Sequence, residues 1–347
     1  MNRGRIPRFV RRAPASRTWP VVAIAATLTA LTLAAAPSVP AAVPDAPPAS
    51  QAGTAAIVKA TAVTDRLVLL SVASPAMGRE VPVYVLTPAD PGAARGVLYL
   101  LDGNSGTPER TNWLDPAKGN AQGFYADKNV NVVMPVGGTG SLYQDWQQDN
   151  PKFGRVRWET FLAEELPPLV DDHFRTNGRN VIGGISSGAQ GALMLAARYP
   201  ELYDGAVGYS GCYLTDGPVG KALTDLIVLN GNGNAELMWG PQGGAAWTDH
   251  DLFANAHRLA GKKIYLSSGT GSAGPHETLD RPDLANLLVV GGALEAGSNM
   301  CTEQLAGALR DAGADVTRSA QPVGVHAWTY WRDEVARSWP TVEAALA

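Results

Sequence analysis

The sequence predicts an α/β protein in which helices cover both faces of a mostly parallel sheet. Short apolar segments that suit buried strands alternate with longer helical segments, as connected βαβ units require. Two apolar segments, residues 96–101 and 130–136, end at Asp-Gly and Gly-Gly pairs, as expected at the carboxyl edge of a parallel sheet. A further segment, residues 179–199, has the composition of a strand, a sharp glycine turn and a helix. These three observations define the fold class.

The chain before this fold has the composition of an export signal. Residues 1–42 contain six arginines and no acid, an apolar run from about Val21 to Ala36, and small residues near Ala42. Because this run is short and weakly apolar for a span of about 20 residues, we expect cleavage and a secreted or cell-envelope location. Residues 43–62, rich in Ala and Pro, should form a flexible linker, and residues 63–347 a single domain.

The strands are predicted by apolar or alternating segments with turn residues at their ends. Pro75 to Gly78 should join the first two strands as an antiparallel pair, and the later strands should be parallel. The expected strands cover residues 66–74, 80–86, 96–101, 130–136, 181–185, 205–210, 262–268 and 316–323.

The helices are predicted by apolar residues at steps of three and four. Residues 157–174 should form a helix that Pro167-Pro168 kinks or breaks, and residues 283–312 two helices interrupted near Ala296-Gly297. The other helical segments follow the glycine turn up to residue 199, run through residues 212–260 as an excursion, and close the chain over residues 328–347.

Gly184-Ile185-Ser186-Ser187-Gly188 has the G-x-S-x-G pattern of a nucleophile elbow. An ordinary glycine turn is the alternative, because a chain with 38 glycines will contain such a pattern by chance. The apolar strand before the turn and the small-residue helix after it favour a nucleophile. In this architecture the hydroxyl of Ser186 would project above the carboxyl edge of the sheet.

A serine hydroxyl needs a base, and in α/β-hydrolases the chain order is serine, acid, histidine. Of the five histidines, His326 alone follows the last predicted strand, so we expect it to be the base. The others precede Ser186, fall in the helical excursion or lie in a Gly/Pro loop: His173, His250, His257 and His276. Residue spacing leaves the acid open among Glu277, Asp280, Asp283 and Glu295.

Charge and composition exclude several other functions. Without residues 1–42, 22 basic residues face 32 acidic ones, a net charge of −10 that argues against nucleic-acid binding. The glycine-rich segments lack the pattern of a phosphate or dinucleotide loop, so we expect no cofactor and no metal.

Cys212 and Cys301 suit a disulfide in an exported chain better than two free thiols.

From about residue 66 to 340 the chain resembles the antigen 85 type mycolyltransferases, secreted acyltransferases of mycolic-acid-bearing actinobacteria. The resemblance implies a single α/β-hydrolase domain that moves a long branched acyl group through a serine ester, typically between trehalose esters. Its motifs are YLLDG (99–103), VVMPVGG (132–138), Tyr143 with Asp145-Trp146, WETFLAEELP (158–167), the Ser186 elbow, MWGP (238–241) and GVHAWTYW (324–331).

Carried over by position, the resemblance makes Ser186 the nucleophile and His326 the base, and it selects Glu295 as the acid. The backbone N–H groups of Asn104 and Ser187 would form the oxyanion hole. The side chain of Asn104, where the family more often has an apolar residue, would then be free.

The resemblance also implies a sugar-binding role for Asp102 and an aromatic contact for Trp328. Where the family usually has an arginine, this chain has Ser105, and Arg110 is near enough in sequence to replace that arginine. A bridge between Cys212 and Cys301 would pin the acid-bearing segment to the sheet edge.

The sequence therefore predicts a secreted, monomeric acyltransferase whose substrate is a trehalose ester or related glycolipid among the lipids of the cell envelope. A secreted carboxylesterase with the same three residues is the first alternative. An envelope-binding or adhesion protein on a hydrolase scaffold is the second, and the complete Ser-His-Glu set argues against it.

Overall fold

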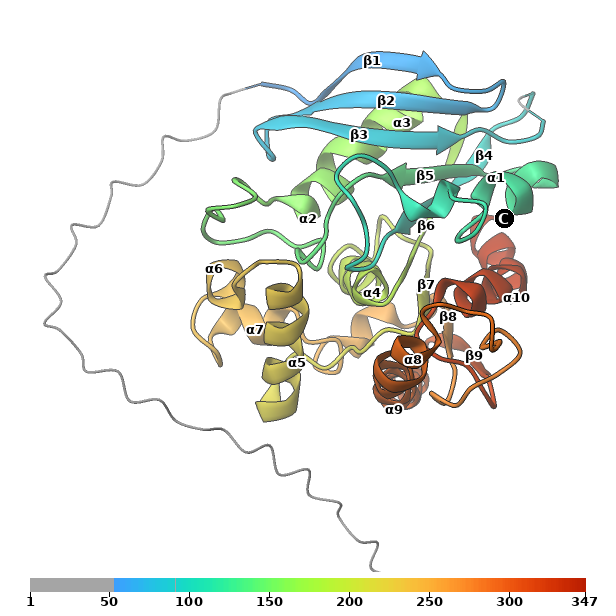
Figure 1. The fold of residues 1–347 in the computed structure, drawn as a ribbon. Coiled ribbons are helices and arrows are strands. Elements are labelled where there is room, and N and C mark those ends of the chain that lie inside the picture. The colour runs from blue at the N-terminus through green and yellow to red at the C-terminus, as the bar shows by residue number, and fades with distance from the viewer. Residues whose placement is uncertain (1–52, 91) are drawn as a thin grey trace, which may run out of the picture. The chain divides into compact units, whose positions relative to one another are not determined.

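A nine-stranded sheet runs through the part of the chain that the computed structural model describes, residues 53–90 and 92–347 (Figure 1). Its spatial order is β1-β2-β3-β5-β4-β6-β7-β8-β9, with antiparallel pairing from β1 to β5 and parallel pairing from β5 to β9. The mostly parallel sheet predicted from the sequence is thereby confirmed. The strands are β1 (Ala56–Ala62), β2 (Leu67–Ser74), β3 (Arg79–Leu86), β4 (Arg95–Leu101), β5 (Asn131–Pro135), β6 (Thr176–Ile185), β7 (Gly205–Tyr209), β8 (Lys263–Ser268) and β9 (Asp315–Ala320).

The N-terminal edge of the sheet contains one strand more than the sequence predicted. Residues 56–62, expected to belong to a flexible linker, form β1 and pair antiparallel with β2. Nearly all of β1 is exposed, so its side chains carry no apolar alternation that could reveal a strand. The expected export signal, residues 1–42, lies outside the described residues.

Helices cover both faces of the sheet, as predicted. One apolar core packs α3, α4 and part of α9 against the sheet, and a second packs α10 and the region around α1 against the other face. The helices are α1 (Ala121–Phe124), α2 (Trp158–Thr160), α3 (Leu166–His173), α4 (Ser187–Arg198), α5 (Gly217–Asn230), α6 (Ala235–Trp239), α7 (Ala245–Asp249), α8 (Leu284–Asn286), α9 (Gly292–Asp311) and α10 (Trp328–Leu346). Within the described residues, none of these helices has the length and apolar character needed to cross a membrane.

Short 3-10 and π segments complete the helical structure. The 3-10 segments are η1 (Asn112–Leu114), η2 (Tyr125–Asp127) and η4 (Ala256–Leu259). The π segments are η3 (Phe161–Glu165), between α2 and α3, and η5 (Leu287–Gly291), between α8 and α9.

The two predicted interruptions of helices have different outcomes in the structure. Residues 158–173 form one continuous helical run of α2, η3 and α3, in which Pro167 and Pro168 directly follow the π segment η3. A proline cannot donate to the carbonyl four residues earlier, so the regular hydrogen-bond pattern changes next to the two prolines, and the helix does not break there. Helix α9 runs without a break through Ala296-Gly297. One interior glycine costs only about 1 kcal/mol, which the packing of α9 outweighs. The irregular turn lies earlier, at η5.

Candidate active site

Ser186 occupies the sharp turn between β6 and α4. Its backbone has φ 53° and ψ −123°, a strained conformation for a residue with a side chain. A Cβ on Gly184 would lie 2.5 Å from the backbone of Gly188, and a Cβ on Gly188 would lie 2.3 Å from the carbonyl oxygen of Asp102. The two glycines of the pattern are therefore required by the close approach of the turn to itself and to the end of β4.

The structure brings Ser186 together with His326 and Glu295. The distance from Ser186 Oγ to His326 Nε2 is 2.9 Å, and from His326 Nδ1 to Glu295 Oε2 it is 2.8 Å. An ionised carboxylate can only accept, so the bond to Glu295 places a proton on Nδ1 and leaves Nε2 of a neutral imidazole free to accept from Ser186. The geometry matches the hydrogen-bond arrangement of a serine nucleophile, its base and an orienting acid.

Glu295 is buried, with 2% of its surface exposed, and its second oxygen is also bonded. Oε1 accepts from the hydroxyl of Ser210 at 2.7 Å and from the N–H of Gly269 at 2.6 Å. Ser210 in turn accepts from Trp331 Nε1 at 2.9 Å. Sequence reasoning missed Ser210, although its place at the carboxyl end of a predicted parallel strand was a usable signal.

The other carboxylates that residue spacing left as candidate acids do not bond His326. Glu277 accepts from the N–H of Gly274, and Asp283 forms an ion pair with Arg281 at 2.9 Å. Among the four candidate acids, all within the described part of the chain, Glu295 is the one that bonds the imidazole.

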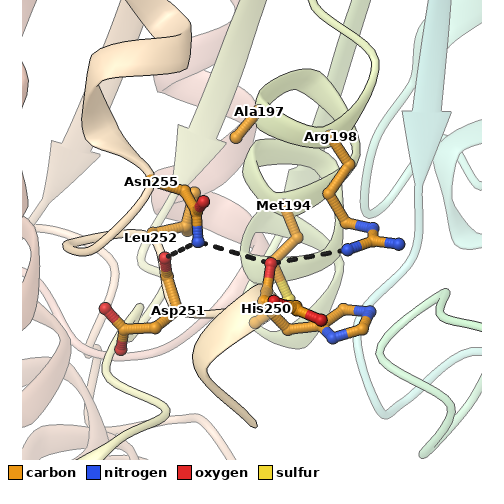
Figure 2. A pocket seen from close by; sticks show the side chains of 8 residues that line it. Met194, Ala197, Arg198, His250, Asp251, Leu252 and Asn255 are labelled. Atoms are coloured by element: carbon orange, nitrogen blue, oxygen red, sulfur yellow. Dashed lines mark hydrogen bonds between the residues drawn. The ribbon is translucent and has the colours of Figure 1, made fainter. Parts of the chain in front are cut away.

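Two other histidines that the chain order disfavoured also pair elsewhere. His276 bonds Asp333 at 2.8 Å. His250 lies against the C-terminal part of α4, next to Arg198 in a crevice that Figure 2 shows and that is too small to admit a water molecule. Its Nε2 lies 3.5 Å from the buried carboxylate of Glu159, to which Arg198 also bonds. This cluster is structural.

The backbone N–H groups expected to bind an oxyanion lie beside Ser186. Ser187 is the first residue of α4, where N–H groups have no intrahelical acceptor and the helix dipole favours negative charge. Asn104 follows β4, and both residues line the same cleft as Ser186. Within residues 53–90 and 92–347, neither N–H is bonded to another backbone group.

Ser186 and His326 lie in a cleft with a volume of about 1050 Å³. One wall is α5, which contributes Val219, Leu223 and Leu226. The facing wall is η5 with the start of α9, which contributes Leu287, Val290 and Leu294. Polar residues, among them Ser105, Lys118 and Thr329, line another part, next to Trp328. The cleft therefore suits a substrate with a long apolar portion and a polar head. Neither wall was predicted from the sequence.

Asp102 is not among the residues that line the cleft. Its side chain is 1% exposed, and Oδ2 accepts from the N–H of Asn112 at 3.0 Å. Burial raises the pKa of Asp102 to about 6, although hydrogen bonds from Asn112 and Thr111 act in the opposite direction. Sugar binding by Asp102 stays a prediction, and it would require the residues that cover the carboxylate to move.

Lys118, and not the expected Arg110, is the cation linked to Ser105 in the cleft. Arg110 is exposed and does not line the cleft. Lys118 does line it, and its Nζ donates to Asn112 Oδ1 at 2.6 Å. Asn112 also donates to the Ser105 carbonyl at 3.0 Å, which joins the two cleft residues.

Cys212 and Cys301 form a disulfide, as predicted. Cys212 follows β7, and Cys301 lies on α9 between one and two turns after Glu295. Thr302 adds a hydrogen bond from α9 to the Gly211 carbonyl at 3.2 Å. The helix that carries Glu295 is therefore fastened beside the carboxyl end of β7.

The sheet, the elbow and the contacts of Ser186 define an α/β-hydrolase. The chain matches the family model described as "Putative esterase" over residues 74–341. It is 30% identical over 285 residues to the diacylglycerol acyltransferase/mycolyltransferase Ag85A of Mycobacterium tuberculosis, covering 80% of each chain. The chain belongs to this esterase family, and within it to the antigen 85 mycolyltransferases, so it is an acyl-transferring enzyme.

Solved structures agree with this assignment. The crystal structure of M. tuberculosis MPT51 superimposes with a TM-score of 0.66 at 26% identity, covering 80% of this chain and 98% of that one. The serine hydrolase FphF of Staphylococcus aureus gives a TM-score of 0.58 at 18% identity, over 83% and 99% of the two chains, and at that identity it supports the fold alone.

Proposed function

We propose that this protein is an exported, monomeric serine acyltransferase that transfers a long, mycolyl-type acyl group between sugar esters through an ester on Ser186. The observation that carries the proposal is the 2.9 Å contact of Ser186 Oγ with His326 Nε2 inside an apolar-walled cleft. The family membership supports the same chemistry.

In the first half-reaction, Ser186 Oγ attacks the carbonyl carbon of the donor ester while His326 Nε2 takes the hydroxyl proton. The tetrahedral intermediate collapses with cleavage of the ester C–O bond, and His326 returns the proton to the leaving sugar oxygen. Glu295 stays ionised and stabilises the imidazolium that forms in between.

The second half-reaction repeats these steps in reverse. A hydroxyl of the acceptor loses its proton to His326 and attacks the acyl carbonyl, and Ser186 leaves with the proton returned. In both halves the N–H groups of Ser187 and Asn104 would hold the negative oxygen, a contribution on the order of 100- to 1000-fold per donor.

Transfer requires that an acceptor hydroxyl attack faster than water. The polar part of the cleft, with Ser105, Lys118 and Trp328, is the place where a sugar could be oriented for this attack. We propose trehalose or another envelope sugar as acceptor. Because the name of the relative Ag85A includes a diacylglycerol acyltransferase activity, diacylglycerol is a second acceptor to test.

Hydrolysis is the alternative outcome of the same acyl-enzyme. The esterase description of the family favours it, and so does the partial exposure of Ser186 and His326 to solvent. A secreted carboxylesterase would use the same three residues and lack an effective acceptor site.

We propose in addition that residues 1–42 direct export and are removed. The linker would then end before β1, and the catalytic domain would extend from β1 to the C-terminal region. Secretion would place the enzyme among cell-envelope lipids, which would include its proposed substrates.

One experiment separates the candidate functions. The protein is incubated with a trehalose monoester donor, with and without added trehalose or diacylglycerol, and the lipids are resolved. New diacyl trehalose or triacylglycerol supports a transferase, and free fatty acid alone supports an esterase. Unchanged donor would point to a binding protein and contradict both enzymatic functions. Ser186→Ala should abolish all turnover and all labelling by a serine-directed phosphonate.

A further inference from the structure

Both polar atoms of the Asn104 side chain are hydrogen-bonded, although only its backbone N–H was expected to act. Its Oδ1 accepts from Ser187 Oγ at 2.9 Å and from the N–H of Gly140 at 3.2 Å, and its Nδ2 donates to the Ile227 carbonyl at 2.7 Å. The amide orientation is fixed, because a backbone N–H can only donate and a carbonyl can only accept. The Ser187 hydroxyl must therefore be the donor in its bond to Asn104.

This arrangement links the two residues of the proposed oxyanion hole through their side chains. Ser187 belongs to α4, whereas Asn104 belongs to the segment after β4, so the two N–H groups come from separate elements. A hole stabilises charge only when both donors are held at the position that the oxyanion will occupy. The bond from Ser187 to Asn104 fixes their relative position.

The remaining bond of the Asn104 amide reaches α5, one wall of the cleft. Only Gly220, Thr224 and Val228 are buried in this helix of 14 residues, so little apolar packing holds it. The Ile227 carbonyl lies in the last turn, where it also accepts the N–H of Gly231 at 3.3 Å, so Asn104 supplies its second hydrogen bond. Asn104 therefore fastens the C-terminal end of α5 beside the proposed hole.

The apolar side of α5 is open to solvent in the absence of substrate. Val219, Leu226 and Leu229 are 59%, 57% and 68% exposed, and Val219 and Leu226 line the cleft. A long acyl chain on this wall would remove apolar area from water. Each Å² buried in this way contributes about 25 cal/mol of favourable free energy. Covering α5 in this way would hold the helix, and with it the Ile227 carbonyl, in the position seen here.

We propose that Asn104 is a positioning residue that couples the acyl-binding wall to the oxyanion hole. A long acyl chain that lies on α5 then stabilises the hole without touching it. Donor length should therefore raise kcat in addition to lowering KM, because the gain appears in the transition state. This inference rests on the proposed function of Ser186 and on the proposed hole.

The test compares hydrolysis of p-nitrophenyl butyrate and p-nitrophenyl palmitate. In Asn104→Leu we expect kcat for the palmitate ester to fall about 100-fold, with a smaller loss for butyrate, so that the palmitate-to-butyrate ratio of kcat decreases. Ser187→Ala keeps the bond to α5 and should lower kcat for both esters by a similar factor, about 3- to 10-fold.

Asn131→Leu is the control, because Asn131 lies in the sheet, does not line the cleft, and bonds the Arg95 carbonyl through its side chain at 3.4 Å. Asn131 is 1% exposed and Asn104 is half-buried, so the control should lose at least as much packing. It should lower the unfolding temperature and leave the ratio of kcat unchanged. All rates are measured below the unfolding temperature of the least stable variant.

Equal losses for both esters in Asn104→Leu would overturn the coupling, as would an equal change of the ratio in Asn131→Leu. Turnover that survives in Ser186→Ala would instead overturn the proposed function. The two failures are therefore distinguishable.

Discussion

The imidazole of His326 packs edge to face against the indole of Trp331, with ring centroids 4.9 Å apart and planes at 87°. Trp331 also donates its Nε1–H to Ser210, which bonds Glu295. One side chain thus touches the proposed base, His326, and through Ser210 supports the proposed acid, Glu295.

Replacing Trp331 by Phe should keep an aromatic ring against His326 and remove the donor to Ser210. We expect kcat for ester hydrolysis to fall about 3- to 10-fold with little change in KM, because a bond that orients Glu295 is weakened. Steady-state kinetics measure the effect. Trp331→Ala, which removes the ring contact as well, should cost more, and equal losses in the two variants would argue against a role for the donor.

The ionisation of Asp102 should lower the free energy of unfolding as the pH rises. Its pKa is raised to about 6 in the folded state by burial, above the ordinary value of 3.8. The protonated carboxyl of Asp102 contributes about 2 to 3 kcal/mol to the free energy of unfolding. This contribution is fully present below pH 3.8 and is lost as the pH rises through 6.

Asp102→Asn, which cannot ionise, should therefore gain stability relative to wild type between pH 4.5 and 7.5, as measured by urea unfolding. Asp172→Asn, at an exposed position, is the control and should follow the wild type. A constant difference between Asp102→Asn and wild type across this range would contradict the expected ionisation.

Removing the disulfide should destabilise the fold and disturb the acid. Its two cysteines are separated by 89 residues, and closing a loop of this length contributes about 2 to 4 kcal/mol. In the Cys212→Ala/Cys301→Ala variant we expect a loss of this size in urea unfolding and a drop in kcat below the unfolding temperature. Thiol titration of the denatured, unreduced wild type should find no free thiol, and two free thiols would contradict the bridge.

Lys118 should influence which nucleophile accepts the acyl group. Its ammonium lies in the polar part of the cleft, where the sequence offered Arg110. In Lys118→Met we expect the ratio of acyl transfer to hydrolysis to fall about 3- to 10-fold, because one donor to the acceptor is lost. Product analysis with a labelled donor measures the ratio. Lys152→Met removes an exposed lysine elsewhere and should leave the ratio as in wild type.

Chain order and local pattern sufficed to predict the sharp turn at Ser186 and a place for His326 beside it, because both depend on residues near each other in sequence or on sheet topology. The acid did not follow from spacing, since a carboxylate on α9 reaches His326 only through the packing of that helix against β8. Family resemblance selected Glu295 where elementary reasoning left four candidates.

Two further features, the cleft-lining face of α5 and the role of the Asn104 side chain, could not be predicted from the local sequence. The apolar residues of α5 have the composition of a buried helix, yet they face the cleft, and sequence alone does not separate these cases. The role of the Asn104 side chain depends on Gly140 and Ile227, which are distant along the chain and meet only in the folded protein.

The position of Glu295 near the start of α9 has an evolutionary consequence. The segment that carries the acid also supplies Leu287, Val290 and Leu294 to the cleft wall, so a substitution that reshapes this wall also acts on the acid. If α5 is tied to the oxyanion hole as proposed, neither wall can diverge without a catalytic cost. Descendants of this enzyme would therefore acquire new acceptors, through residues 105–118, more readily than new acyl chains.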